Sequence, residues 1–175
     1  MSGHILPFQG VRPTIAADVF VAPTATVIGD VVIGADTNVW FNCVIRGDVH
    51  EIRIGERTNI QDGTIIHVTG GKLGTYIGSD ITIGHGAILH ACTLEDCCFI
   101  GMGAVILDGA VVETGAMVAA GAVVTPGKRV KAGELWGGNP AKLLRQLSEA
   151  DQAYFPVSAV NYVALAKRYM DEANG

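Results

Sequence analysis

Three of the five histidines in the chain are candidates for a shared metal site. His85 and His90 are five residues apart, and His67 lies eighteen residues before His85. Three imidazole ligands that leave one coordination position open are typical of metal centres that activate water. Cys92, close behind, is a weaker candidate for a fourth ligand. Two residues five apart, such as His85 and His90, do not lie on the same face of a helix or of a flat strand. The fold therefore decides whether the three histidines meet.

Length and composition indicate one folded domain. The chain has 175 residues, of which 49% are hydrophobic and 17% charged, so it does not have the composition of a disordered protein. A net charge of −5 argues against a nucleic-acid-binding surface and against attraction to anionic lipid. We find no secretory signal pattern and no apolar run long enough to span a membrane. The adjacent Cys97 and Cys98 suit neither a disulfide framework nor a zinc ribbon, so we expect reduced thiols and a cytoplasmic protein.

A six-residue repeat decides the fold class. Aliphatic residues recur at every sixth position, with turn-forming Gly, Asp or Asn three positions after many of them. A short strand followed by a turn, repeated in this way, is typical of a parallel β-helix. We predict a single domain over 1–175 with the β-helix over 12–133, and buried thiols at Cys43 and Cys98, which fall at a small inward position. The aliphatic positions are Val21, Val27, Ile33, Val39, Ile45, Ile54, Ile60, Ile66, Ile77, Ile83, Leu89, Leu94, Ile100, Ile106, Val112, Val118, Val124 and Val130.

The part of the chain after the repeat predicts helices. Asn139–Pro140 is a typical helix start, and the segment 148–151 is a Ser-x-x-Asp capping pattern. Pro156 is expected to break or kink the helix, and a second helical run follows from about Ser158. We therefore expect an α-helical segment over 139–173 that packs along the β-helix.

Two segments resemble the gamma-class carbonic anhydrases, which belong to the hexapeptide-repeat superfamily. They are RGDVHEIRIGERTNIQDGTIIH at 46–67 and IGHGAILHACTLEDCCFIGMGAVI at 83–106. The likeness extends over about residues 12–165. The polar residues of these segments make the resemblance specific to this family, whereas the six-residue repeat alone would not. The resemblance implies a mainly β protein, a left-handed parallel β-helix with three hexads in each coil, and a trimeric assembly. The residues that carry it are Arg46, Asp48, Gln61, Asp62, His67, His85 and His90.

Three hexads per coil place the candidate ligands in two columns. The first column contains Arg46, His67 and His90. Each of them directly follows the aliphatic residue of its hexad, and the three hexads are one coil apart, so the three side chains point outward in line. Adjacent coils are about 4.8 Å apart, which lets His67 and His90 reach one ion. His85 stands beside a turn on the preceding face, one coil above Asp62, in a second column. In a trimer, the first column of one chain can meet the second column of its neighbour.

The resemblance implies reversible hydration of carbon dioxide to bicarbonate by a metal-bound hydroxide. The ion would take His67 and His90 from one chain and His85 from the next, and Arg46 would pair with Asp62 across the same interface. Zn²⁺ is the expected ion, and Fe²⁺ or Co²⁺ would accept the same ligands. We expect a homotrimer without nucleic-acid or membrane partners. Four further residues receive roles: Gln61 and Tyr162 in catalysis, Asp48 and Asn161 in support.

Two departures from the family pattern concern the removal of protons. The resemblance implies a glutamate directly after Asp48, where this chain has Val49. It also implies an acidic loop after the first ligand histidine, where this chain has the acid-free VTGGKLGT at 68–75. Rapid turnover needs a proton relay, so we expect weak hydration activity. His50 would suit that role because an imidazole titrates near neutral pH.

Two other functions remain open at the level of sequence. Hexapeptide-repeat proteins include acyltransferases that use coenzyme A thioesters, with one histidine as general base. Such an enzyme needs one free histidine rather than three around an ion. The other alternative is a metal-stabilised scaffold with little activity. Metal stoichiometry separates the acyltransferase from the other two hypotheses, and the activity of metal-loaded protein separates the hydratase from the scaffold.

Overall fold

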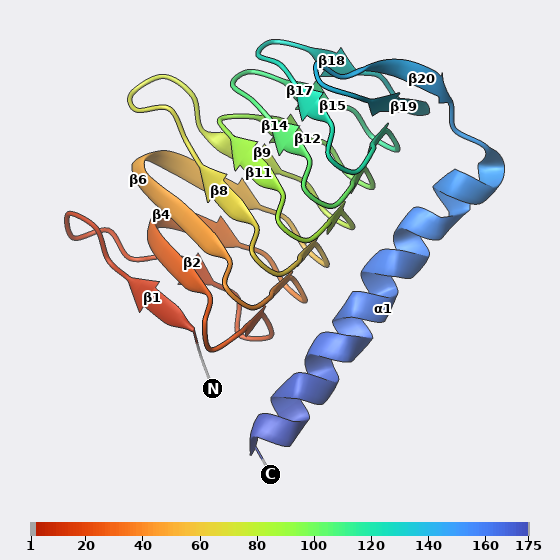
Figure 1. Ribbon diagram of the computed structural model, residues 1–175. Coiled ribbons are helices and arrows are strands. Elements are labelled where there is room, and N and C mark those ends of the chain that lie inside the picture. The colour runs from red at the N-terminus through yellow and green to blue at the C-terminus, as the bar shows by residue number, and fades with distance from the viewer. Residues whose placement is uncertain (1–2, 175) are drawn as a thin grey trace.

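The chain winds into a parallel β-helix with one long helix beside it (Figure 1). The computed structural model describes residues 3–174. Successive coils run from the N-terminal strands to the C-terminal ones, and short strands form the three faces of each coil. The expected fold class, a mainly β parallel β-helix followed by a helical segment, is confirmed.

Two faces of the coil form one continuous twelve-stranded sheet. Its strands are β1 (His4–Leu6), β2 (Thr14–Ile15), β4 (Thr26–Ile33), β6 (Val44–Ile54), β8 (Ile65–His67), β9 (Thr75–Ile77), β11 (Ile88–His90), β12 (Thr93–Leu94), β14 (Val105–Ile106), β15 (Val111–Val112), β17 (Val123–Val124) and β18 (Arg129–Val130). The faces are joined because β6 bends around a corner, pairing with β8 through its first half and with β9 through its second. β1 pairs in parallel with β4, so this sheet begins before residue 12, where the repeat predicted the start of the β-helix.

The third face is a separate eight-stranded sheet. Its strands are β3 (Phe20–Val21), β5 (Asn38–Val39), β7 (Asn59–Ile60), β10 (Thr82–Ile83), β13 (Phe99–Ile100), β16 (Met117–Val118), β19 (Glu134–Gly137) and β20 (Lys142–Gln146). All pairs are parallel except the last, in which β20 runs antiparallel to β19. From β8 to β16, each strand pairs with the strand three positions later in the chain, so three strands complete one coil.

Ladders of aliphatic side chains fill the interior of the coils. Ile45, Ile66 and Leu89 lie in register on three adjacent strands and are fully buried. Cys43 and Cys98 are buried as predicted, and desolvation raises the pKa of the Cys43 thiol to about 11. Thiols in such surroundings behave as small apolar groups and pack between the larger side chains.

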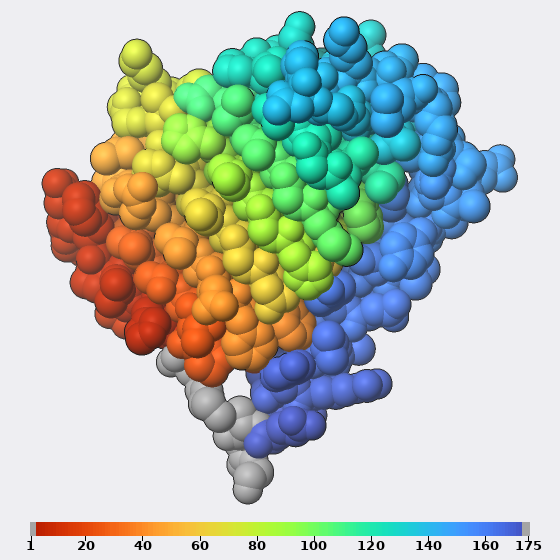
Figure 2. All heavy atoms as spheres, viewed as in Figure 1, coloured from red at the N-terminus to blue at the C-terminus, as the bar shows by residue number. Residues whose placement is uncertain are grey.

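The helix α1 (Glu149–Asn174) covers the eight-stranded sheet. Trp40 points outward from this sheet, yet it is only 4% exposed because α1 packs over it. Its ring lies 5.5 Å from that of Tyr162 and 5.3 Å from that of Tyr169, centroid to centroid. In the space-filling view, the blue atoms of α1 run along one side of the coils (Figure 2). The outward side chains of this face therefore form a second buried layer beneath the helix.

The predicted helix from Asn139 and the predicted second helix are both wrong. Residues 142–146 form β20, because their backbone pairs with β19 after the turn-forming Gly-Gly-Asn-Pro segment at 137–140. One helix follows, and it continues through Pro156 without a break. The neighbouring Phe155 is 3% exposed, so packing against the sheet holds this turn in helical form although the proline lacks an N–H.

Candidate metal centre

His67 and His90 face each other across two adjacent strands. They are the last residues of β8 and β11, and the strand register pairs their Cα atoms. His67 Nδ1 and His90 Nε2 are 3.3 Å apart, and the ring centroids are 5.3 Å apart. The structure thus brings together two of the three histidines, in the column that the hexad count predicts.

The outer nitrogen of each ring is held by a carboxylate. His67 Nε2 lies 3.0 Å from Asp48 Oδ1, and His90 Nδ1 lies 2.6 Å from Asp108 Oδ1. Burial alone would raise the pKa of Asp48, but hydrogen bonds, first from His67, outweigh it and lower that pKa. Hydrogen bonds from Thr69 and His90 lower the pKa of Asp108. Both carboxylates are therefore ionised acceptors at neutral pH, and each ring donates an N–H to one of them.

The two facing nitrogens suit a shared cation. A neutral imidazole that donates through its outer nitrogen presents a lone pair at the other. Two lone pairs 3.3 Å apart repel each other unless a proton or a metal ion lies between them. A tetrahedral Zn²⁺ at about 2.1 Å from each nitrogen would hold the pair about 3.4 Å apart. The residues therefore fit a metal ion, and the carboxylates supply the outer hydrogen bonds that ligating histidines usually have.

His85 lies away from this pair in the same chain. Its Nδ1 is 2.9 Å from Asp62 Oδ2, and the side chains are 44% and 43% exposed. Asp62 lies one coil below His85, as the hexad count predicts, because β7 pairs with β10. Among residues 3–174, no group of three or more His, Cys, Asp or Glu side chains could hold a metal ion. One chain therefore presents a histidine pair on one face and a third, exposed histidine on another.

Gln61 and Tyr162 line a cavity together with His85. The cavity has a volume of about 330 Å³ and lies between α1 and the strands β10, β13 and β16. Gln61 Nε2 donates to Asn59 Oδ1 at 3.0 Å, and Gln61 Oε1 accepts no hydrogen bond within the described part of the chain. Desolvation, followed by the charge of Asp62, raises the pKa of Tyr162, so its hydroxyl is protonated at neutral pH.

The two remaining support residues lie in different surroundings. Arg46 pairs with Asp48 of its own chain, so this carboxylate joins Arg46 to His67. Arg46 and Asp62 belong to different columns, and the pair that the resemblance implies between them is not made within one chain. Asn161 is exposed on α1.

Cys92 is unsuited to binding the ion. Its side chain is 1% exposed, and desolvation raises the pKa of the thiol to about 12. The side chain belongs to the hydrophobic core of the coil, so the thiol does not lie on the outer surface where His67 and His90 face each other.

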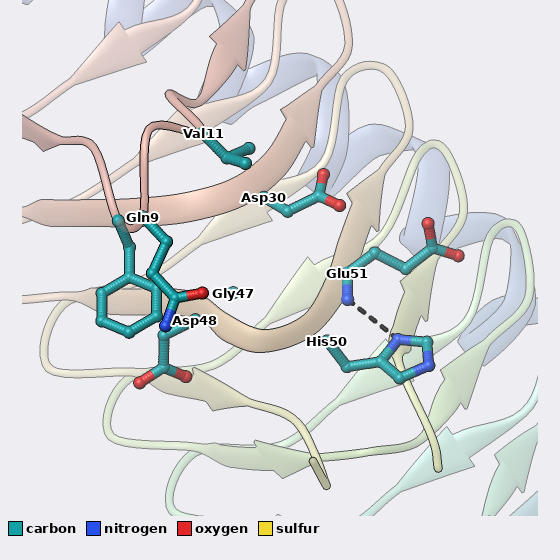
Figure 3. Close-up of a pocket in the computed structure, with 8 residues that line it drawn as sticks. Gln9, Val11, Asp30, Gly47, Asp48, His50 and Glu51 are labelled. Atoms are coloured by element: carbon teal, nitrogen blue, oxygen red, sulfur yellow. Dashed lines mark hydrogen bonds between the residues drawn. The ribbon is translucent and has the colours of Figure 1, made fainter. Parts of the chain in front are cut away.

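Asp48 also borders an open cavity of about 360 Å³ beside β6 (Figure 3). His50 lies on the same rim, two residues further along the strand. Its Nδ1 accepts a hydrogen bond from the Glu51 N–H at 2.8 Å, so the neutral ring carries its proton on Nε2. His50 is thus close in the strand to the carboxylate that holds His67.

Sequence reasoning missed Asp108 and Thr69. Ile106 of β14 pairs with Leu89 of β11, so Asp108 lies one coil beyond His90. Counting one more coil on the same face places Leu107 at the position of His90, and Asp108 is the next residue, so the count comes within one residue of this carboxylate. Thr69 Oγ1 donates to the other oxygen of Asp108 and so connects the loop 68–75 to the carboxylate that holds His90. No signal in the repeat marks Thr69, because it lies in an insertion.

Comparisons with known proteins show the family. The chain matches the family described as "Bacterial transferase hexapeptide (six repeats)" at residues 12–47 and 91–126. It is 51% identical over 165 residues to "Gamma carbonic anhydrase 2, mitochondrial" of Arabidopsis thaliana, which covers 91% of this chain and 59% of that protein. It is 48% identical over 147 residues to a "Carbonic anhydrase" of Geobacillus kaustophilus, which covers 84% of this chain and 80% of that protein. The chain belongs to the gamma carbonic anhydrase family.

A solved structure agrees with this assignment of the fold. The hexapeptide transferase family protein from Anaplasma phagocytophilum superposes with a TM-score of 0.92 at 48% identity, over 95% of this chain and 98% of that one. The chain spans about 60% of the length of two Arabidopsis relatives. Relatives are named both as carbonic anhydrases and as transferases, so the choice between these reactions depends on the site.

Proposed function

We propose that the protein is a metal-dependent carbonic anhydrase whose site is shared between subunits of a homotrimer. The observation that carries this proposal is the pair of facing imidazole nitrogens, each ring backed by a carboxylate. His67 and His90 of one chain and His85 of the next would hold the ion. The same apposition would bring Arg46 of one chain to Asp62 of the other. Zn²⁺ is the proposed ion, and Fe²⁺ or Co²⁺ would suit the same ligands.

The reaction adds water to carbon dioxide and releases bicarbonate and one proton. A bound ion would supply one part of the chemistry, because it lowers the pKa of a water molecule to about 7. Gln61 Oε1 would accept a hydrogen bond from the reacting water and so orient its oxygen towards carbon dioxide. The protonated hydroxyl of Tyr162 would donate to an oxygen of bicarbonate. Asp48 and Asp108 would keep the histidine rings in the orientation that the ion needs.

Acyl transfer from a coenzyme A thioester is the second candidate. The matching family is described as a bacterial transferase, and the solved relative from Anaplasma phagocytophilum is named a hexapeptide transferase family protein. His85 lines a cavity and could act as a general base there. A single-base mechanism gives no role to the His67–His90 pair or to its two carboxylates, so the hydratase accounts for more of the site. A metal-stabilised scaffold with little activity would use the pair without catalysis.

The proposal also includes an assembly, the homotrimer, and a location, the cytoplasm. The proposed homotrimer would bring His85, which lies on a different face from the histidine pair, to the pair of a neighbouring chain. A net charge of −5 favours neither nucleic acid nor an anionic membrane as a partner. Among residues 3–174, no helix is long and apolar enough to cross a bilayer. A cytoplasmic location remains part of the proposal.

Elemental analysis and stopped-flow hydration of carbon dioxide on one purified sample test the proposal. We expect about one metal ion per chain, loss of hydration on chelation, and recovery with Zn²⁺ or with Fe²⁺ under anaerobic conditions. A metal-loaded protein without hydration above background, even in concentrated imidazole, would leave the scaffold as the better hypothesis. A protein that binds no metal and transfers an acetyl group from acetyl coenzyme A would establish the acyltransferase instead.

A further inference from the structure

We propose that Thr82 and Ser158 are positioning residues that orient Gln61 through Asn59. This inference rests on the proposed function, in which Gln61 Oε1 accepts a hydrogen bond from the reacting water. The four side chains form an unbroken line of hydrogen bonds from α1 to the cavity beside His85. None of the four residues is more than 5% exposed. Water therefore competes little for these bonds.

One backbone carbonyl sets the direction of the whole line. Asn59 Nδ2 donates to the Ile81 carbonyl oxygen at 3.2 Å, and a carbonyl oxygen can only accept. Asn59 Oδ1 consequently faces Gln61, and it accepts a hydrogen bond from Gln61 Nε2 at 3.0 Å. Gln61 Oε1 is the atom that remains for the cavity. A reversed Gln61 amide would present a donor there, which cannot accept a hydrogen bond from water.

Thr82 and Ser158 hold this orientation from the side of the helix. Asn59 Nδ2 donates to Thr82 Oγ1 at 2.9 Å, and Thr82 lies directly above Asn59 because β10 pairs with β7. Thr82 Oγ1 is in turn 2.8 Å from Ser158 Oγ on α1. A buried polar group that loses its partner is destabilised, so these bonds strongly favour one arrangement of the amides. The docking of α1 and the orientation of Gln61 are therefore coupled.

Paired substitutions with a matched control test this inference in the metal-loaded trimer. Thr82→Val removes the hydroxyl at nearly constant volume, and we expect kcat/KM for hydration to fall about fivefold to tenfold. Thr82→Ser, which keeps the hydroxyl, should retain kcat/KM within about twofold of the wild type. Ser158→Ala should also lower kcat/KM. Ser148→Ala, the same substitution at the exposed start of the same helix, should leave it unchanged.

The double variant with Gln61→Ala separates positioning from general damage. A residue that acts only through Gln61 has no further effect once that amide is gone, so adding Thr82→Val should cause no additional loss. Additive losses in the double variant would overturn the inference. So would an unchanged kcat/KM in Thr82→Val. If Thr82→Val does not fold, an unchanged kcat/KM in Ser158→Ala would overturn it instead.

A second measurement is independent of catalysis. The side-chain amide protons of Gln61, observed by NMR in the labelled trimer, should exchange with solvent about tenfold faster in Thr82→Val than in the wild type. Faster exchange in a protein without hydration activity would support the positioning and reject the proposed function. Unchanged exchange in Thr82→Val would overturn the positioning whichever reaction the protein catalyses.

Discussion

Asp108 holds His90 from outside in the same way that Asp48 holds His67. The charge of Asp108 fixes the orientation of the His90 ring and makes the ring more basic. Replacing Asp108 by Asn keeps the shape of the side chain but removes this charge. Asp108→Asn should therefore weaken Zn²⁺ binding about tenfold to a hundredfold, as the loss of an outer carboxylate usually does. Competition with a chromophoric chelator would measure the change. Glu113→Gln is the control, since this carboxylate pairs with Arg129; equal affinities in the two variants would contradict a supporting role for Asp108.

Val49 occupies the position where the family pattern has a proton-relaying glutamate, and its side chain is 49% exposed. If proton removal limits turnover, imidazole buffer should raise the hydration rate in proportion to its concentration until another step becomes limiting. Val49→Glu should reduce that dependence, because the new carboxylate can carry the proton away. Stopped-flow rates at several imidazole concentrations would measure this effect. Val32→Glu, at another exposed valine, is the control, and a Val49→Glu enzyme with the buffer dependence of the wild type would contradict the argument.

At the scale of elements, α1 begins with a reciprocal capping box that the sequence predicted. Ser148 Oγ accepts from the Asp151 N–H at 3.2 Å, while Asp151 Oδ2 accepts from the Ser148 N–H at 2.8 Å. Ser148→Ala should lower the free energy of unfolding by about 1 kcal/mol, because it leaves an N–H of the first turn without its partner. Urea denaturation at a fixed protein concentration would measure the difference. An effect smaller than the error of the fit would show that the cap contributes nothing to stability.

The same cap makes the stability of α1 depend on pH. Hydrogen bonds from Arg145, and then from Ser148, lower the pKa of Asp151 in the folded protein. A lowered folded-state pKa means that the ionised carboxylate stabilises the fold above the unfolded pKa of about 3.9, and that this contribution is lost as the pH falls further. The difference in Tm between the wild type and Asp151→Asn should thus be constant above about pH 5 and should shrink below about pH 4. A Tm difference that grows on acidification would contradict this sign.

The success of prediction from sequence also differs between elements. Ile66 and Leu89 occupy the same inward position in successive coils, so one periodic rule predicts both, together with the stacking of His67 on His90. The periodic rule does not apply outside the repeat, so the prediction for residues 142–146 depends on local patterns alone. Those patterns favour a helix, whereas pairing with β19 makes this segment a strand. The hydrogen bond between Thr82 and Ser158 joins residues 76 apart and depends on how α1 docks, which no local pattern encodes.

At the scale of the whole molecule, the proposed site requires that the first column of one chain meet the second column of its neighbour. His67→Ala and His85→Ala should each abolish metal binding in their own trimers. After co-refolding of equal amounts, every mixed ring should contain one interface that joins an intact histidine pair to an intact His85. Random mixing would then restore about a quarter of the wild-type metal content, measured by elemental analysis of the isolated trimer.

The mixture of His67→Ala with His90→Ala is the matched control for this experiment. Both substitutions damage the same column, so every interface in every mixed ring lacks one member of the pair, and no metal should be recovered. A site within one chain would be absent from both mixtures. Recovery of metal binding in the first mixture but not in the second would therefore require a site built from the histidine pair of one chain and His85 of another. A first mixture that stays free of metal, or a stable monomer with a full metal content in light scattering, would reject the shared site.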